Sequence, residues 1–172
     1  MITAIMFGVI AGVIASIAER ADVALTGGNA TPLGFVNTYT WLLVSATAFG
    51  PIGAIFTTEV QAFLGLVTFA NPLSWLWPFI NLVFATVVGT VSRGLSRARP
   101  QINLRSRLII LSCTCALLDV PLTYVVVVSV LGLPFGVYLL ALPMYIILQL
   151  LPSTVISYAI LRGIQRARLI ER

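Results

Sequence analysis

The chain has 172 residues, of which 59% are hydrophobic and only 9% are charged. Soluble domains carry about 25% charged residues, so this composition excludes an ordinary soluble globular protein. The net charge of +5 comes from ten basic residues, all arginine, and five acids. The arginines flank apolar stretches. We therefore interpret them as topology signals that also contact anionic lipid, and we expect no nucleic-acid partner.

The arginines occur mainly in two short clusters. The first cluster contains Arg93, Arg97, Arg99, Arg105 and Arg107, and the second contains Arg162, Arg166, Arg168 and Arg172. Cytoplasmic loops of membrane proteins carry an excess of positive charge, so both clusters are predicted to face the cytoplasm. The remaining Arg20 lies beside Glu19 and Asp22 after the first apolar run, as expected for an outer loop.

Six apolar runs are predicted to cross the membrane, since a crossing needs about 20 residues. The first run lacks the basic start and the small-residue cleavage site of a signal peptide, so it is predicted to be the first helix. The predicted helices are 2–18, 34–48, 52–70, 78–95, 108–131 and 136–161. The turns between them are TGGNATP in an outer loop over 19–33, Phe49-Gly50-Pro51 inside, Asn71-Pro72 outside and Gly132-Leu133-Pro134 outside.

These observations predict a single all-α integral membrane domain over residues 1–172. It has six transmembrane helices, with both termini in the cytoplasm, and is multi-pass in the cell membrane. The run VVVVSV in the fifth helix has high β-propensity, but an isolated strand cannot satisfy its backbone in lipid, so a helix is predicted there.

Small residues follow one stripe of the first predicted helix at Ala4, Gly8, Ala11 and Ala15. Such a stripe lets two helix backbones approach closely in lipid. It therefore indicates either packing within this protein or a docking face for another membrane subunit.

Enzyme chemistry finds little support in the residues. Histidine is absent, which removes the usual ligands of a metalloprotease and the base of a serine-protease-like triad. The chain contains no P-loop motif. Cys113 and Cys115 are two residues apart and are interpreted as apolar packing. No enzyme activity, metal or cofactor is therefore predicted.

Polar side chains at membrane depth are the remaining candidates for function. An intramembrane acid costs about 3 kcal/mol even on the lenient insertion scale, so it normally faces a cavity or a partner. Glu59, Asp119, Gln149 and Asn81 are predicted at such depth. They can serve as hydrogen-bonded contacts between helices or as ligand-binding groups, and both alternatives stay open. Trp75 and Trp77 similarly fit an aromatic belt or a stacking surface.

The run FGPIGAIFTTEVQAFLG, the Pro/Trp-containing loop after it and the helix ending in SRGLSRAR resemble the substrate-binding S components of energy-coupling factor transporters. Members of that family have six helices, both termini inside and a Gly-Pro-x-x-Gly-like turn that opens the third helix. The turn here is Gly50-Pro51-Ile52-Gly53, one residue shorter. Ala11-x-x-x-Ala15 is similar to the family's Ala-x-x-x-Ala surface, which contacts the coupling subunit. The implied coupling-subunit interface is Ala4, Gly8, Ala11 and Ala15.

The resemblance implies a membrane subunit for micronutrient uptake. Such a subunit binds a vitamin or vitamin precursor on the outer face, and then delivers it through a transmembrane coupling protein driven by two ATPase subunits. The metal-binding members have a histidine-bearing N-terminus that this chain lacks, so a metal substrate is not expected. Projected onto this chain, the family's site implies the substrate-binding residues Asn37, Trp41, Glu59, Trp75, Trp77, Asn81, Asp119, Tyr124, Tyr138, Tyr145 and Gln149.

The residue types predict the character of the ligand. Two membrane-depth carboxyls with several Trp and Tyr favour a small heterocycle that is cationic or rich in hydrogen-bond donors, such as thiamine or its pyrimidine precursor. A different class of protein fits the same topology. Rod-shape scaffold proteins of the MreD type are small, five- or six-helix and similar to S components, yet they need no ligand pocket.

Overall fold

The computed structural model describes residues 1–26, 32–68 and 73–167, and within these ranges it contains helices and no strand. The helices are α1 (Ile2–Thr26), α2 (Pro32–Val67), α3 (Trp77–Ala98), α4 (Leu104–Tyr124), the π-helix η1 (Val125–Val130), α5 (Phe135–Tyr145), the π-helix η2 (Ile146–Leu150) and α6 (Leu151–Arg166). Five continuous helical stretches in the described ranges are long and apolar enough to cross a membrane. The all-α prediction is confirmed.

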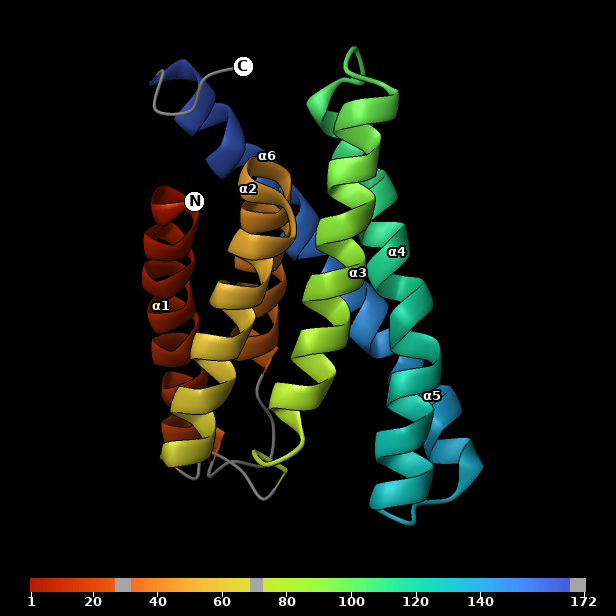
Figure 1. Cartoon of the computed structure of the whole chain (residues 1–172). Coiled ribbons are helices and arrows are strands. Elements are labelled where there is room, and N and C mark those ends of the chain that lie inside the picture. The colour runs from red at the N-terminus through yellow and green to blue at the C-terminus, as the bar shows by residue number, and fades with distance from the viewer. Residues whose placement is uncertain (27–31, 69–72, 168–172) are drawn as a thin grey trace.

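α2 reverses its direction at Gly50, inside the predicted turn. Gly50 has φ 67° and ψ −149°, a conformation that is essentially restricted to glycine. A straight helix would separate Ser45 from Thr57 by about 18 Å. Their hydroxyl oxygens nevertheless lie 2.7 Å apart. α2 is therefore a helical hairpin, whose first half rises to the turn and whose second half, from Pro51, descends beside it (Figure 1).

α1 packs closely against the second half of α2. A Cβ atom on Gly8 would lie 2.7 Å from the Cβ of Phe56, and one on Gly12 would lie 2.5 Å from the carbonyl oxygen of Thr57. The backbones can approach this closely only because both positions lack a side chain. Ala4, Ala11 and Ala15 of the same stripe are also buried. The stripe thus packs within the protein, and the interpretation of Ala4, Gly8, Ala11 and Ala15 as a free docking face is corrected.

α3 and α6 pack against the α2 hairpin from its other sides. A Cβ on Gly89 of α3 would lie 2.4 Å from the Cα of Pro51, so α3 touches the turn backbone directly. On α6, the hydroxyls of Ser153 and Ser157 donate to the carbonyl oxygens of Val36 (2.8 Å) and Thr40 (3.0 Å). These bonds satisfy polar groups across helices where water is excluded.

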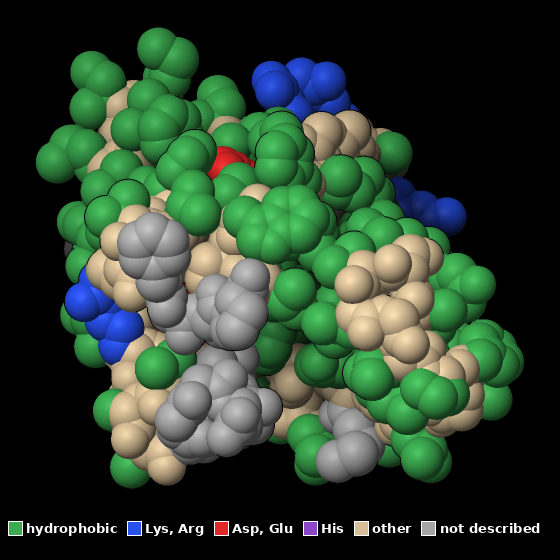
Figure 2. Space-filling model, turned by 90° about the horizontal axis from the view of Figure 1, so that it is seen from below, with side chains coloured by type: hydrophobic (Ala, Val, Ile, Leu, Met, Phe, Trp, Pro, Cys, Tyr) green, Lys and Arg blue, Asp and Glu red, His purple; other side chains and the backbone are tan. Residues whose placement is uncertain are grey.

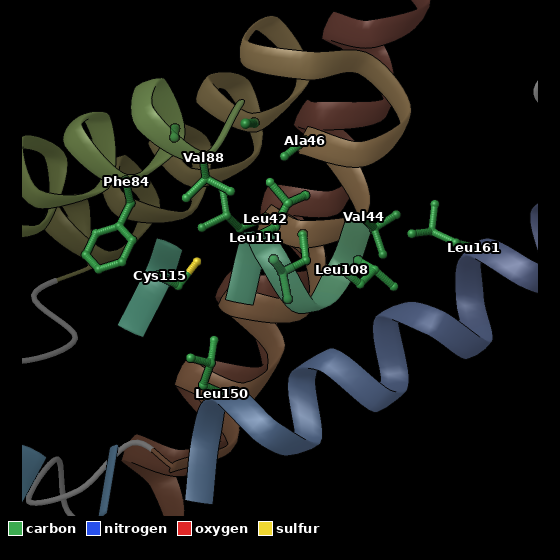
Figure 3. Packing of buried hydrophobic residues seen from close by; sticks show 13 residues of the cluster. Leu42, Val44, Ala46, Phe84, Val88, Leu108, Leu111, Cys115, Leu150 and Leu161 are labelled. Atoms are coloured by element: carbon green, nitrogen blue, oxygen red, sulfur yellow. The ribbon is translucent and has the colours of Figure 1, made fainter. Parts of the chain in front are cut away.

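The hydrophobic core lies where the first half of α2 meets α3, α4 and α6. Its fully buried leucines are Leu42 and Leu43 from α2 and Leu108 and Leu111 from α4. Figure 3 shows Leu42 and Leu111 beside Val88 of α3. Aliphatic side chains from four different helices therefore hold together elements that are far apart in the sequence.

Prolines explain the two π-helical segments. Pro121 lies inside α4, four residues before η1 begins at Val125, and Pro143 lies inside α5, three residues before η2 begins at Ile146. Proline cannot donate a backbone hydrogen bond and clashes with the preceding turn, and a wider π turn accommodates that disturbance. The run VVVVSV is thus helical, as predicted, and it ends before the turn at Gly132, whose φ is 64°.

The main error in the predicted bounds concerns the end of α1. The loop predicted to begin at residue 19 is helical up to Thr26, and Glu19 and Asp22 are only 6% and 2% exposed. These carboxylates do not mark an outer loop, because hydrogen bonds inside the protein hold them: Gln61 donates to Glu19, and the backbone N–H of Gly34 donates to Asp22. The other predicted helices lie within a few residues of the observed ones. The predicted turns at residues 27–31 and 71–72 fall outside the described residues.

The start of α1, the Gly50 turn, the α3–α4 connection and the end of α6 lie at one end of the molecule, here called the arginine end (Figure 1). Figure 2 views the molecule from the opposite end. Among the described residues, most side chains visible on that face are hydrophobic, and Arg side chains show only at its margin. The two ends therefore differ in charge.

Candidate ligand-binding site

A cavity of about 90 Å³ lies toward the end opposite the arginines. It forms where α1 ends, α2 and α3 begin and α4 passes into η1. The residues that line it are Glu19, Gly34, Phe35, Thr38, Tyr39, Leu42, Thr58, Gln61, Trp77, Ile80, Asn81, Phe84, Asp119, Leu122, Thr123, Val126, Val127 and Tyr145. A single water needs about 10–15 Å³, so the cavity is large enough for a small molecule.

Asp119 supplies the carboxylate on the α4 side of the cavity. One carboxylate oxygen, Oδ1, accepts a 2.6 Å hydrogen bond from the hydroxyl of Tyr39. The second oxygen, Oδ2, is buried and has no hydrogen-bond partner among the described residues. A buried carboxylate oxygen without a partner is costly, so this atom is a natural acceptor for a ligand's N–H or O–H group.

A chain of three polar side chains crosses the opposite side of the cavity. Asn81 of α3 donates to Oε1 of Gln61 at 3.0 Å, and Gln61 donates to Oε2 of Glu19 at 2.6 Å. Asn81 also donates to the carbonyl oxygen of Thr58 at 3.1 Å. These bonds orient the two amide groups, because the Gln61 amide accepts from Asn81 and donates to Glu19, while the Asn81 amide donates to both Gln61 and Thr58. It therefore places a carboxylate and two fixed amides on one wall.

Asp22 has a structural role beside this wall. Its Oδ2 accepts a 2.5 Å hydrogen bond from the backbone N–H of Gly34, in the first turn of α2. A carboxylate at a helix N-terminus satisfies an otherwise unpaired N–H and interacts favourably with the helix dipole. Asp22 thus fixes the start of α2, which carries Phe35 and Tyr39 into the cavity.

Aromatic rings form the remaining wall. The ring of Phe35 meets Trp77 edge-on with a centroid distance of 5.5 Å, and meets Tyr145 in the same way at 5.8 Å. The indole Nε1 of Trp77 is buried without a hydrogen-bond partner in the described part of the chain. The cavity therefore combines flat apolar surfaces with two lining residues, Asp119 and Trp77, that each carry a buried polar atom without a hydrogen-bond partner among the described residues.

Four of the substrate-binding residues predicted from the sequence line this cavity together, namely Trp77, Asn81, Asp119 and Tyr145. Sequence reasoning missed Tyr39, Gln61 and Glu19. Gln61 is a polar residue within a predicted membrane helix, two positions after Glu59, and this was the signal that could have identified it. Glu19 gave no such signal, because charged residues at the end of an apolar run ordinarily mark a loop.

The other predicted residues lie elsewhere. The Asn37 side chain donates to the carbonyl oxygen of Ile14 at 3.1 Å, and Trp41 packs edge-on against Phe7. Trp75 is 52% exposed, as expected for a belt position. Tyr124 and Tyr138 contact each other at 5.5 Å, and Tyr138 donates to the carbonyl oxygen of Val120. Glu59 is half-buried and Gln149 is buried, and neither lines the cavity.

The titratable groups that line the cavity are the carboxyls of Glu19 and Asp119 and the phenols of Tyr39 and Tyr145. Across residues 1–26, 32–68 and 73–167, no group of three or more Cys, Asp or Glu side chains could hold a metal ion. The cavity can recognise a small molecule by hydrogen bonds and ring contacts.

Comparison of the chain with protein-family models, with curated proteins and with solved structures finds no match. The function is therefore inferred from the cavity and from the arrangement of helices around it.

Proposed function

We propose that the chain is a multi-pass protein of the cell membrane, with six helical segments that cross the bilayer. Each half of the α2 hairpin has about 17 residues and a length of about 26 Å, close to the roughly 30 Å of the hydrocarbon layer. Large apolar side chains cover the outer faces of the helices, among them Ile17, Phe63, Phe79, Leu117 and Leu140. An even number of crossings puts both termini on one side, and the arginines favour the cytoplasm for that side.

Cysteine labelling is expected to show this orientation. Gln101, in the α3–α4 connection, and Leu133, in the turn before α5, are both exposed and lie at opposite ends of the molecule. A membrane-impermeant maleimide added to intact cells should label Leu133→Cys and leave Gln101→Cys unlabelled until the membrane is opened. Both variants need a background with Cys113→Ala, because Cys113 is exposed whereas Cys115 is fully buried. Labelling of both positions from outside would contradict six crossings.

We further propose that the protein is the substrate-binding subunit of an energy-coupling factor type uptake transporter. The cavity carries this proposal, because at the end opposite the arginines it is lined by Asp119 and Trp77, whose carboxylate oxygen Oδ2 and indole N–H have no hydrogen-bond partner among the described residues. In the proposed orientation that end faces outward, where a nutrient is captured. The substrate would then pass through a transmembrane coupling protein that two ATPase subunits drive. Because the small-residue stripe packs internally, the coupling protein would contact a different surface of the chain.

The cavity also favours one of the ligands expected from the sequence. A ring with an amino group offers a donor to Asp119 and a ring nitrogen that accepts from Trp77. A substituted pyrimidine is smaller than a whole thiamine and so needs less of the cavity's volume of about 90 Å³. The pyrimidine precursor of thiamine is therefore the first ligand to test.

Mass spectrometry of the purified protein tests the binding function. Protein purified from its native membrane in mild detergent is denatured, and the supernatant is analysed for small molecules. A polar heterocycle released in near-stoichiometric amount is the expected result. A scaffold of the MreD type needs no ligand. Such a role would be favoured if no small molecule is released and if added pyrimidine or thiamine fails to raise the unfolding temperature.

A further inference from the structure

A second hollow lies at the arginine end, between the start of α4 and the end of α6. This groove has a volume of about 620 Å³, and its walls include Arg105, Ser106, Ile109, Tyr158, Arg162 and Gln165. The sequence places Arg105 and Arg162 in separate clusters. The fold brings one arginine of each cluster to the same groove.

The two arginines occupy similar heights on their helices. The hydroxyls of Ser112 in α4 and Thr154 in α6 lie 2.6 Å apart, which fixes the two helices at that level. Arg105 is seven residues from Ser112 and Arg162 is eight residues from Thr154, so each lies about 10–12 Å further along its own helix in the direction of the arginine end. Both helices continue past their contact, and Figure 1 shows them diverging toward this end. The groove is the space between them.

The groove is positively charged at its mouth and apolar toward the middle of the molecule. None of the lining residues among those described is Asp or Glu. The guanidinium of Arg162 lies 5.6 Å from the ring centre of Tyr158, which orients it as a cation–π contact. The N-terminus of α4, capped by Asn103, adds the positive end of a helix dipole. One turn beyond Arg105, Ile109 is 48% exposed and continues the wall as apolar surface.

We propose that this groove binds an anionic phospholipid. Arg105 and Arg162 hold the phosphate, the Ser106 hydroxyl donates a further hydrogen bond to it, and one acyl chain lies along Ile109. Arginine forms paired hydrogen bonds with phosphate oxygens, and basic pockets between membrane helices recognise lipid head groups in this way. The proposal rests on the membrane location of the chain and is independent of the ligand cavity. It assigns one arginine of each cluster to a specific lipid site, beyond the effect of the clusters on topology.

Native mass spectrometry of the protein titrated with phosphatidylglycerol in detergent tests the proposal. The wild type should bind one lipid selectively over phosphatidylcholine, and Arg105→Gln/Arg162→Gln should bind it about 25-fold more weakly, about fivefold for each arginine. Arg97→Gln/Arg99→Gln removes the same charge from exposed positions that do not line the groove. That control should bind phosphatidylglycerol as tightly as the wild type.

Three outcomes would overturn the proposal. Equal weakening in both double variants would show a diffuse effect of net charge. Equal binding of phosphatidylcholine would show that the groove does not require a lipid with a net negative charge. Displacement of the lipid by millimolar inorganic phosphate would assign the groove to a free anion. Ile109→Ser provides a second test, since it should weaken phosphatidylglycerol binding while leaving both arginines in place.

Discussion

Replacement of Gly12 by alanine is expected to lower the thermal unfolding midpoint of the purified protein by about 5–10 °C. The new Cβ would lie 2.5 Å from the carbonyl oxygen of Thr57 and 2.8 Å from the Cβ of Val60. The carbonyl belongs to a helix backbone and cannot rotate aside as a side chain could, so α1 must shift away from α2. Such overpacking costs about 2–3 kcal/mol, and each kcal/mol shifts the midpoint by about 2–4 °C in a chain of this size.

Gly94→Ala is the matched control for this substitution. Gly94 is also a helical glycine, but a Cβ there would meet nothing within 4 Å. The control should be neutral or slightly stabilising, because alanine favours the helix by about 0.5–1 kcal/mol over glycine. Thermal unfolding of both variants in the same detergent gives the comparison. If Gly12→Ala proved as stable as Gly94→Ala, α1 would not pack on α2 as the structure describes, and a docking role for the stripe would regain support.

Asp119→Asn is expected to weaken ligand binding by about 10- to 100-fold while the protein stays folded. Asparagine keeps the size of aspartate, and its carbonyl oxygen can still accept from the Tyr39 hydroxyl. It loses the acceptor at Oδ2, which we propose binds the ligand's N–H group. A hydrogen bond to a charged group contributes about 1.5–3 kcal/mol, and every 1.4 kcal/mol corresponds to a factor of ten in affinity. Calorimetry with the pyrimidine precursor, or with the ligand released from the purified protein, measures this loss.

Glu59→Gln makes the same chemical change at another membrane-depth acid. Glu59 does not line the cavity, although its Oε1 is also buried without a partner in the described ranges. This variant should bind the ligand with unchanged affinity. Loss of binding in both variants would indicate a general effect of intramembrane charge. Unchanged affinity in Asp119→Asn would place the ligand elsewhere or make the acid structural.

The helical architecture, with stretches long and apolar enough to cross a membrane, follows from the composition and residue pattern of the chain. Composition and the spacing of apolar runs predict the helices within a few residues except at the end of α1, because lipid would leave a backbone few alternatives to an α-helix. The reversal at Gly50 was also predictable, since glycine tolerates the required φ and the following proline interrupts the helix. The position of the arginines predicts which end faces the cytoplasm, and labelling can test that prediction.

The site was only partly predictable. Asp119, Asn81 and Trp77 stood out as polar or aromatic groups in apolar surroundings, and the structure brings them to one cavity. Glu19 was assigned to a loop because a charge at the end of an apolar run is normally solvated. Its place in the wall depends on Gln61, 42 residues away, which donates the hydrogen bond that makes burial of the carboxylate tolerable. No local pattern contains that information.

The sequence by itself determined that the chain is helical, that it suits a membrane, where its helices begin and turn, and which end carries the positive charge. These properties depend on single residues and their near neighbours. Only the tertiary structure decided that Gly8 and Gly12 face α2, that Asp119 and the Glu19–Gln61–Asn81 chain enclose one cavity, and that Arg105 and Arg162 share one groove. Each of these depends on which helix faces which, and that is set by close packing between residues distant in the chain.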